Sequence, residues 1–440
     1  MNRVGWFLAL WGVGVVCAGW CAGQEASGAP GATPTVQVNV NRVLVPVVVR
    51  DAQGHLVGDL KQADFQVLDD GKPRSLSGFS VERRAVVGGK AASDPDGVDT
   101  PNLVGDSGGN GTGQIAVAPS GLPDRITVFL FDDLHIAAED LSPVKKAASG
   151  VLAEVVTGSD MAAVVTLSGA VNSGLTRNRE KLQAALENVQ ARGPYRTDKA
   201  ECPRIGYYQA DLIVNKNDAT ALDDLTRQVL NCNPGIDPKR DFEIAQRQAD
   251  SMARQALNMG RQDLQTTYTN LGEFVRRMAK LPGQRTLVVV SPGFVPLEAD
   301  SLMQESQVID LAAQSNVTIS AIDARGLYTT ELDASQHSPN LSTQQLQGDY
   351  RRTGMMIAGN AMGALADGTG GTFFENSNDL AAGFRRVADA PDVVYLLELS
   401  LDGVKADGAY HKLKVKVDRE GVSVQARRGY FMAKEAKKKE

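Results

Sequence analysis

A short, almost wholly apolar run that ends in two carboxylates is the feature that most constrains the fold of this chain. Residues 126–131 read Ile-Thr-Val-Phe-Leu-Phe, and Asp132 and Asp133 follow directly. Three further apolar runs lie at residues 161–167, 286–290 and 317–322. Runs of this kind suit strands that are covered on both faces, as in a parallel sheet between helical layers. We therefore expect an α/β fold with a doubly wound, mainly parallel sheet.

Helical patterns separate these runs. Ser142 suits a helix N-cap and Pro143 the first helical position, so a helix is predicted over residues 143–156. An apolar stripe predicts a long helix over residues 242–281. Shorter helices are expected at residues 178–190, 303–314, 355–366 and 379–387, with a last edge strand at residues 370–374. In open α/β sheets, ligands bind outside the carboxyl ends of the strands, so Asp132 and Asp133 stand where such a fold places its binding site.

The two ends of the chain carry β patterns instead. Residues 36–83 and 392–431 each contain alternating runs separated by turns such as Asp69-Asp70-Gly71. Each segment has too few residues to build an independent hydrophobic core. We favour one β-sandwich that both ends build together, with the α/β domain (residues 124–391) inserted between them. Two separate small β subdomains are the alternative.

Two segments interrupt this layout. Residues 84–123 are rich in Gly, Ser, Asp and Pro and are interpreted as a flexible linker. Residues 192–239 break the α/β pattern, are polar and contain Cys202 and Cys232, which indicates an insertion. Because the N-terminal residues described below predict export, these two cysteines are expected to form one disulfide. Two free thiols are the alternative, and no histidine lies near either cysteine to suggest a zinc site.

The first residues predict export. Arg3 precedes an apolar stretch, and small residues around Cys21 give a cleavage site that would make residues 1–23 a signal peptide. A lipid anchor on Cys17 or Cys21 is an alternative that the flanking residues fit poorly. The mature chain shows no second apolar stretch of spanning length. We expect a periplasmic or secreted protein without a transmembrane span.

Charge narrows the class of partner. The formal net charge of the 440 residues is −6, and Lys and Arg are scattered among Asp and Glu. A nucleic-acid-binding protein usually carries a basic stripe, so no nucleic-acid partner is expected.

The order of strands and helices, with a carboxylate after the first strand, resembles a von Willebrand factor type A domain. The layout also resembles that of bacterial VWFA-related proteins, of the kind common in acidobacteria. The segments that carry the resemblance are residues 160–165, 175–182, 202–203, 208–210, 291–294, 370–374 and 427–431. The resemblance covers nearly the whole mature chain, and it implies a binding or adhesion role rather than a defined chemistry.

The resemblance also implies a divalent-metal site with an Asp-x-Ser-x-Ser motif, a Thr and a second Asp. Mg²⁺ prefers hard oxygen ligands in near-octahedral geometry, which short hydroxyls beside an Asp supply. Here Asp132 matches the first Asp, but Leu134 and Ile136 stand at the serine positions. Thr197 matches the Thr, and Ser291 replaces the second Asp. The site is therefore degenerate.

Two interpretations of Asp132 and Asp133 remain open. In the first, the pair holds Mg²⁺ or Ca²⁺ together with Thr197 and Ser291. In the second, the carboxylates cap the following helix or pair with a nearby basic side chain. His135 is interpreted as a polar loop residue, since the four histidines show no metal-binding spacing.

The sequence as a whole favours an exported, non-enzymatic protein that binds another protein or an extracellular polymer. An exported hydrolase that uses Asp132 and Asp133 is one alternative, although Ser291 does not lie in the Gly-x-Ser-x-Gly turn of hydrolases. A structural envelope component without a metal site is another.

Overall fold

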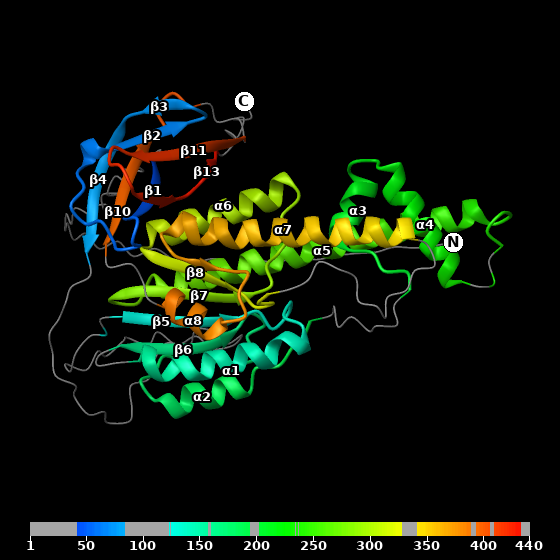
Figure 1. The fold of residues 1–440 in the computed structure, drawn as a ribbon, viewed down its shortest axis with the longest axis horizontal. Helices are drawn as coiled ribbons and strands as arrows, with labels where there is room; N and C mark the ends of the chain where they lie inside the picture. The colour runs from blue at the N-terminus through cyan, green and yellow to red at the C-terminus, as the bar shows by residue number, and fades with distance from the viewer. Residues whose placement is uncertain are drawn as a thin grey trace, which may run out of the picture. The chain divides into compact units, whose positions relative to one another are not determined.

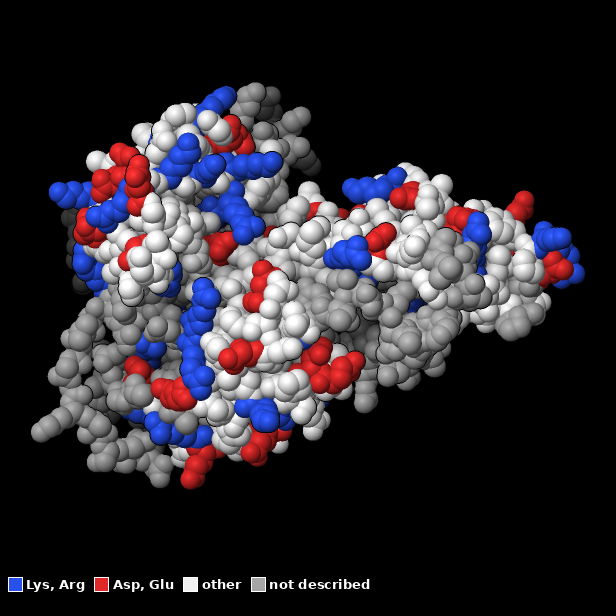
Figure 2. Space-filling model, in the orientation of Figure 1, with Lys and Arg blue, Asp and Glu red and all other residues white. Residues whose placement is uncertain are grey.

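The computed structural model describes residues 42–83, 123, 125–156, 160–193, 202–233, 235, 237–327, 341–388, 393–404 and 409–432. The predicted signal peptide, nearly all of the predicted linker, and Thr197 lie outside these residues. Among the described helices, none is both long and apolar enough to cross a membrane. Lys and Arg alternate with Asp and Glu over the face seen in Figure 2.

The α/β class is confirmed by a five-stranded sheet in which all neighbouring strands are parallel (Figure 1). The order of its strands is β6-β5-β7-β8-β9. The strands are β5 (Arg125–Phe131), β6 (Met161–Thr166), β7 (Gln284–Ser291), β8 (Val317–Asp323) and β9 (Phe373–Phe374). All but one of the side chains of β5 are buried, as the apolar run predicts.

Helices cover both faces of this sheet and form a separate core with each. One core joins the sheet to α5 (Phe242–Met278), α6 (Ala299–Gln314) and α7 (Leu341–Thr369). The other joins it to α1 (Ala138–Val155), α2 (Arg179–Glu187) and α8 (Leu380–Ala388). Alternate strand residues point to opposite layers, so Val128 lies in the first core and Phe129 in the second.

The strand order places a topological switch point between β5 and β7. The chain leaves β5 for β6 on one side of it and later returns to β7 on the other side. At such a point the two connections run to opposite sides of the sheet and leave a crevice at the carboxyl ends of the strands, where ligands bind in open α/β sheets.

Helix α1 begins earlier than the sequence predicts. It starts at Ala138, so Pro143 lies inside the helix and Ser142 is not its N-cap. Glu139 and Asp140 favour the additional turn because negative charge stabilises a helix N-terminus. Leu141 is buried in that turn and anchors it to the core. These contributions outweigh the cost of the backbone hydrogen bond that is lost because a proline inside a helix has no N–H to donate.

Strands from the two ends of the chain share two antiparallel sheets. One has the order β12-β1-β10-β4 and the other β13-β11-β2-β3. Strand β1 pairs with β10, and β2 pairs with β11, so the two ends do not form separate β subdomains. A common apolar core includes residues of both sheets. The strands are β1 (Arg42–Arg50), β2 (Phe65–Asp69), β3 (Lys72–Arg74), β4 (Leu76–Arg83), β10 (Val393–Ser400), β11 (Tyr410–Val417), β12 (Ser423–Ala426) and β13 (Gly429–Phe431).

A buried arginine connects these sheets with the α/β part. The Arg427 side chain donates to the carbonyl oxygens of Leu44 and Gly429 and pairs with Asp310 on α6. Beside it, Arg428 pairs with Asp367 on α7. Removing the Arg427 side chain would leave these backbone acceptors without their partner.

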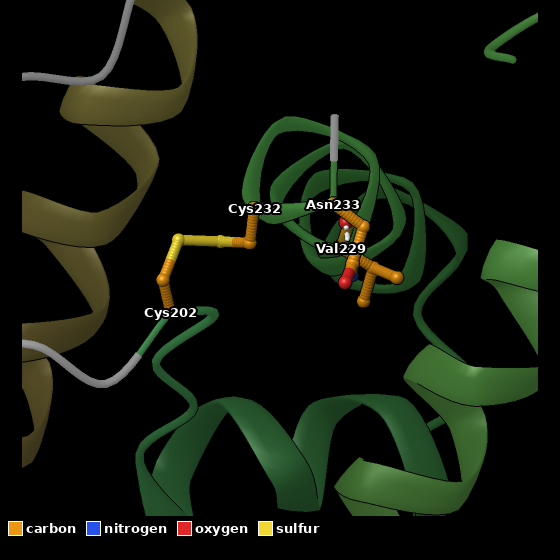
Figure 3. Close-up of a disulfide and its surroundings, with 4 residues drawn as sticks. All are labelled: Cys202, Val229, Cys232 and Asn233. Carbon is orange, nitrogen blue, oxygen red and sulfur yellow. Dashed lines mark hydrogen bonds between the residues drawn. A yellow bond between two sulfur atoms is a disulfide. The ribbon is translucent and has the colours of Figure 1, made fainter. Parts of the chain in front are cut away.

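The described part of the predicted insertion contains two helices, which share a small core with the first half of α5. Helices α3 (Tyr207–Val214) and α4 (Ala219–Cys232) pack on α5, and α3 also contacts α7. Cys232 at the end of α4 forms a disulfide with Cys202, with a Cα–Cα distance of 5.5 Å (Figure 3). Beside it, the Asn233 side chain donates to the Val229 carbonyl oxygen at 2.8 Å, which helps to end α4.

Replacing both Cys202 and Cys232 by serine should destabilise this helical unit by about 2–4 kcal/mol, because the disulfide restricts its unfolded chain. The core of α3, α4 and the first half of α5 is separate from the cores of the sheet. Amide hydrogen exchange should therefore accelerate in α3 and α4 and stay unchanged in β5 and β7. Unchanged exchange in α3 and α4 would contradict a stabilising role for the disulfide.

Candidate functional site

The carboxyl edge of the sheet brings Asp132 and Ser291 together across the switch point. Asp132 follows β5, and its backbone N–H donates to the Val290 carbonyl oxygen at 2.9 Å. Ser291 ends β7, and its hydroxyl donates to Asp132 Oδ2 at 2.5 Å. Asp132 is only 1% exposed. Two of the four residues that the sequence assigned to one site are therefore direct neighbours.

His135 links Asp132 to a second carboxylate that the sequence does not reveal. Its Nδ1 lies 2.7 Å from Asp132 Oδ1 and 2.8 Å from Oδ2. Its Nε2 lies 2.7 Å from Oδ2 of Asp263, which is on α5. The imidazole thus stands between two carboxylates, with 12% of its side chain exposed.

These contacts hold the imidazole in its charged form. Burial alone would lower the pKa of His135, but the negative charge of Asp132 and hydrogen bonds to Asp132 and Asp263 raise it to about 10. His135 is therefore an imidazolium at neutral pH, with both ring nitrogens as donors. A positive charge supplied by the chain itself compensates Asp132.

Asp133 belongs to a second, adjacent group. It accepts hydrogen bonds from the Ser168 backbone N–H at 2.9 Å and from the Ser168 hydroxyl, and Arg192 Nε lies 3.8 Å away. Burial raises the pKa of this carboxyl, while the hydrogen bonds from Ser168 act in the opposite direction. Asp132 and Asp133 thus have different hydrogen-bond partners among the described residues.

Leu134 and Ile136 explain why this turn lacks the hydroxyls of a metal motif. Ile136 is buried in the core on the α1 face, and Leu134 packs against the core on the α5 face. The two side chains fix the turn to both layers, a role that serine could not fill. Gly193 passes so close that a Cβ at that position would lie 2.0 Å from the Leu134 carbonyl oxygen.

The described residues of this arrangement leave few open oxygen ligands for Mg²⁺ or Ca²⁺, and Thr197 lies outside them. Both oxygens of Asp132 already accept hydrogen bonds, and the two motif positions are apolar and packed. A hard cation needs several oxygen ligands free to approach it. The geometry agrees with the interpretation in which side chains of the chain pair with the carboxylates, although the partner of Asp132 is a histidine rather than Arg or Lys.

A further carboxylate at this edge is also paired within the chain. Asp323 ends β8, and its oxygens accept two hydrogen bonds from the Arg325 guanidinium, at 2.8 Å and 2.7 Å.

A second polar group lies in the antiparallel sheets. Asp69, Asp70 and His411 each offer one ligand atom, and these atoms lie within 4.8 Å of one another, so the group could hold a metal ion. No local spacing reveals this group, because Asp70 and His411 come from opposite ends of the chain.

The sequence matches no family model, and it matches no curated protein.

Replacing His135 by glutamine should lower the free energy of unfolding by about 3–5 kcal/mol at neutral pH, since Asp132 would stay buried without its cation. Asp263→Asn is the matched variant and should lower the free energy of unfolding by less. Asp263 is 26% exposed, so water can solvate His135 from that side. Urea unfolding of the three proteins measures the difference. Equal losses in the two variants would contradict the dominant role of Asp132.

The loss caused by His135→Gln should depend on pH. The pKa of His135 in the folded protein, about 10, exceeds its ordinary value of 6.5. The ion pairs therefore stabilise the fold fully below pH 6.5, and their contribution declines as the pH rises to about 10. The difference in unfolding free energy between wild type and variant should shrink over this window. A constant difference would contradict a protonated His135.

Proposed function

We propose that the chain is an exported binding protein with a von Willebrand factor type A-like unit. In this proposal it contacts a protein or an extracellular polymer through the carboxyl edge of the parallel sheet. The observation that carries the proposal is the position of Asp132 and Ser291 on either side of the switch point between β5 and β7. Ligands of open α/β sheets bind at this point.

Catalysis fits the same edge poorly. A serine nucleophile needs a neutral base within hydrogen-bond reach. Ser291 donates to Asp132 instead, and both nitrogens of His135 face carboxylates. The histidine is already protonated at neutral pH, so it cannot take a proton from Ser291. These contacts support a fixed recognition surface over a hydrolytic site.

The residues available to a partner lie around the buried ion pairs. The Leu327 side chain, beyond the end of β8, is 62% exposed, and its backbone N–H donates to the Asn378 side chain at 2.9 Å. The Arg192 side chain is 48% exposed beside Asp133. An exposed apolar side chain and a basic side chain at the same edge suit a partner with apolar and acidic groups.

Site-specific photo-crosslinking in the producing cells tests this surface. A photoreactive amino acid at Leu327 should give crosslinked adducts, and Arg192→Glu should reduce their yield severalfold by removing the attraction for an acidic partner. The matched control position is Ile244, which is 53% exposed on α5 beside the disulfide-linked helices. Adducts at Ile244 but not at Leu327 would place binding on the helical unit and overturn the proposal.

Binding at this edge should be independent of divalent metal. Isothermal calorimetry with Mg²⁺ and Ca²⁺ should therefore give the same result for the wild type and for Asp132→Asn, which keeps the shape of the side chain. A saturable signal that Asp132→Asn abolishes would instead establish the modified metal site of Asp132, Asp133, Thr197 and Ser291.

A further inference from the structure

The group formed by Asp69, Asp70 and His411 lies where a hairpin of the N-terminal strands meets a C-terminal strand. Asp69 ends β2, and Asp70-Gly71 forms the turn into β3, with positive φ at both turn residues. Strand β11 runs beside β2 and carries His411 near its start. The Lys412 backbone N–H donates to Asp70 Oδ1 at 3.0 Å, which leaves Asp70 Oδ2 directed toward His411.

One oxygen of Asp69 is buried without a hydrogen-bond donor. Oδ2 accepts hydrogen bonds from the Tyr430 hydroxyl and from Arg74 Nε, both at 3.2 Å. Oδ1 accepts none from the described residues, although the side chain is only 3% exposed. A buried carboxylate oxygen without a partner is costly, and such an atom in a native fold calls for an explanation such as an ion.

His411 is held in position to be the third ligand. Its ring stacks on Tyr430, with centroids 5.1 Å apart and planes inclined by 13°. Its Nδ1 lies 3.1 Å from Asp70 Oδ2 and 3.6 Å from Asp69 Oδ1. The same tyrosine therefore orients both the imidazole and the buried carboxylate.

We propose that Asp69 Oδ1, Asp70 Oδ2 and His411 Nδ1 bind a divalent transition metal, with Zn²⁺ as the best fit. Zinc bonds of about 2.0–2.1 Å in a tetrahedron place ligand atoms roughly 3.3 Å apart. The separations of 3.1 Å and 3.6 Å bracket this value. Three protein ligands and a water complete the usual open zinc shell. An imidazole ligand disfavours Mg²⁺ and Ca²⁺, which prefer oxygen alone.

A simple ion pair between the His411 imidazolium and the two aspartates does not explain how the buried Asp69 Oδ1 is satisfied. His411 Nδ1 carries one hydrogen, and it lies closer to Asp70 than to Asp69. Asp69 Oδ1 would then stay buried without a donor. A metal ion satisfies both carboxylates and the imidazole at once, and the Tyr430 hydroxyl and Arg74 become the outer groups that fix Asp69.

The metal would connect the two ends of the chain. Asp70 and Lys412 are 342 residues apart in sequence, and the hydrogen bonds between them already join the β2–β3 turn to β11. A metal bound to both segments stabilises the folded state by mass action. The site lies in the antiparallel sheets and does not depend on the function proposed for the parallel sheet.

Titration of the metal-free purified chain tests the site. Zn²⁺ should bind once per chain, as measured by competition with a chromogenic chelator, and should raise the thermal midpoint. Bound Co²⁺ should show the visible absorption that is typical of an ion with a low coordination number. Mg²⁺ at the same concentration should not compete with the chelator for the site and should not raise the thermal midpoint.

Three variants test the ligands. Asp70→Asn should weaken Zn²⁺ binding at least tenfold, and it preserves the turn because asparagine tolerates positive φ. Tyr430→Phe keeps the stacked ring and should weaken binding about 10–100-fold by releasing Asp69. His411→Gln should abolish the Co²⁺ spectrum. The matched control is His55→Gln, which removes an exposed histidine that pairs with Asp51 at 3.3 Å.

Several outcomes would overturn the proposal. One is the absence of stoichiometric Zn²⁺ binding by the wild-type chain. Another is binding that Asp70→Asn and His411→Gln leave unchanged. A third is equal loss in His55→Gln, which would identify adventitious binding to surface histidines. Because Asp70 is on the surface, Asp70→Asn should fold, so the test holds even where His411→Gln is unstable.

Discussion

The imidazolium of His135 between Asp132 and Asp263 is the interaction on which the carboxyl edge of the sheet depends. Asp132 is fully covered by the layers on either side of β5, and a carboxylate in that position needs a compensating charge. His135 supplies this charge from the next turn, and Asp263 carries the contact to α5. These contacts thereby fix the position of the turn after β5 relative to α5.

That local charge balance also decides what the edge can do. In a metal-dependent site, the carboxylate after the first strand would be left open for an ion. Here Leu134 and Ile136 fix the turn in the two cores, and His135 lies over the carboxylate between them. In the proposed function, such an edge recognises a partner by its shape and through exposed side chains such as Leu327.

The sequence predicts the strands well because burial on both faces leaves a clear apolar pattern. It also predicts pairing between the two ends, since neither β segment could build a core alone. The predicted start of α1 is wrong. The sequence suggests Pro143 as the first helical position, but the helix begins one turn earlier, where Leu141 is buried in the core. At the site, Asp132 and Ser291 could be predicted as neighbours, since both follow parallel strands. Asp263 could not, because it is one polar residue on a long helix and only tertiary packing brings it to His135.

The same limit hides the group of Asp69, Asp70 and His411, whose members meet only when the two ends pair. The two clusters illustrate two ways to accommodate a buried carboxylate. Asp132 accepts hydrogen bonds at both oxygens, from Ser291 and a protonated histidine. Asp69 has one oxygen satisfied and one that accepts no hydrogen bond within the described part of the chain. If a metal ion binds this chain, the physical need for one is therefore greater at the β2–β3 turn than at the edge where the resemblance to type A domains would place it.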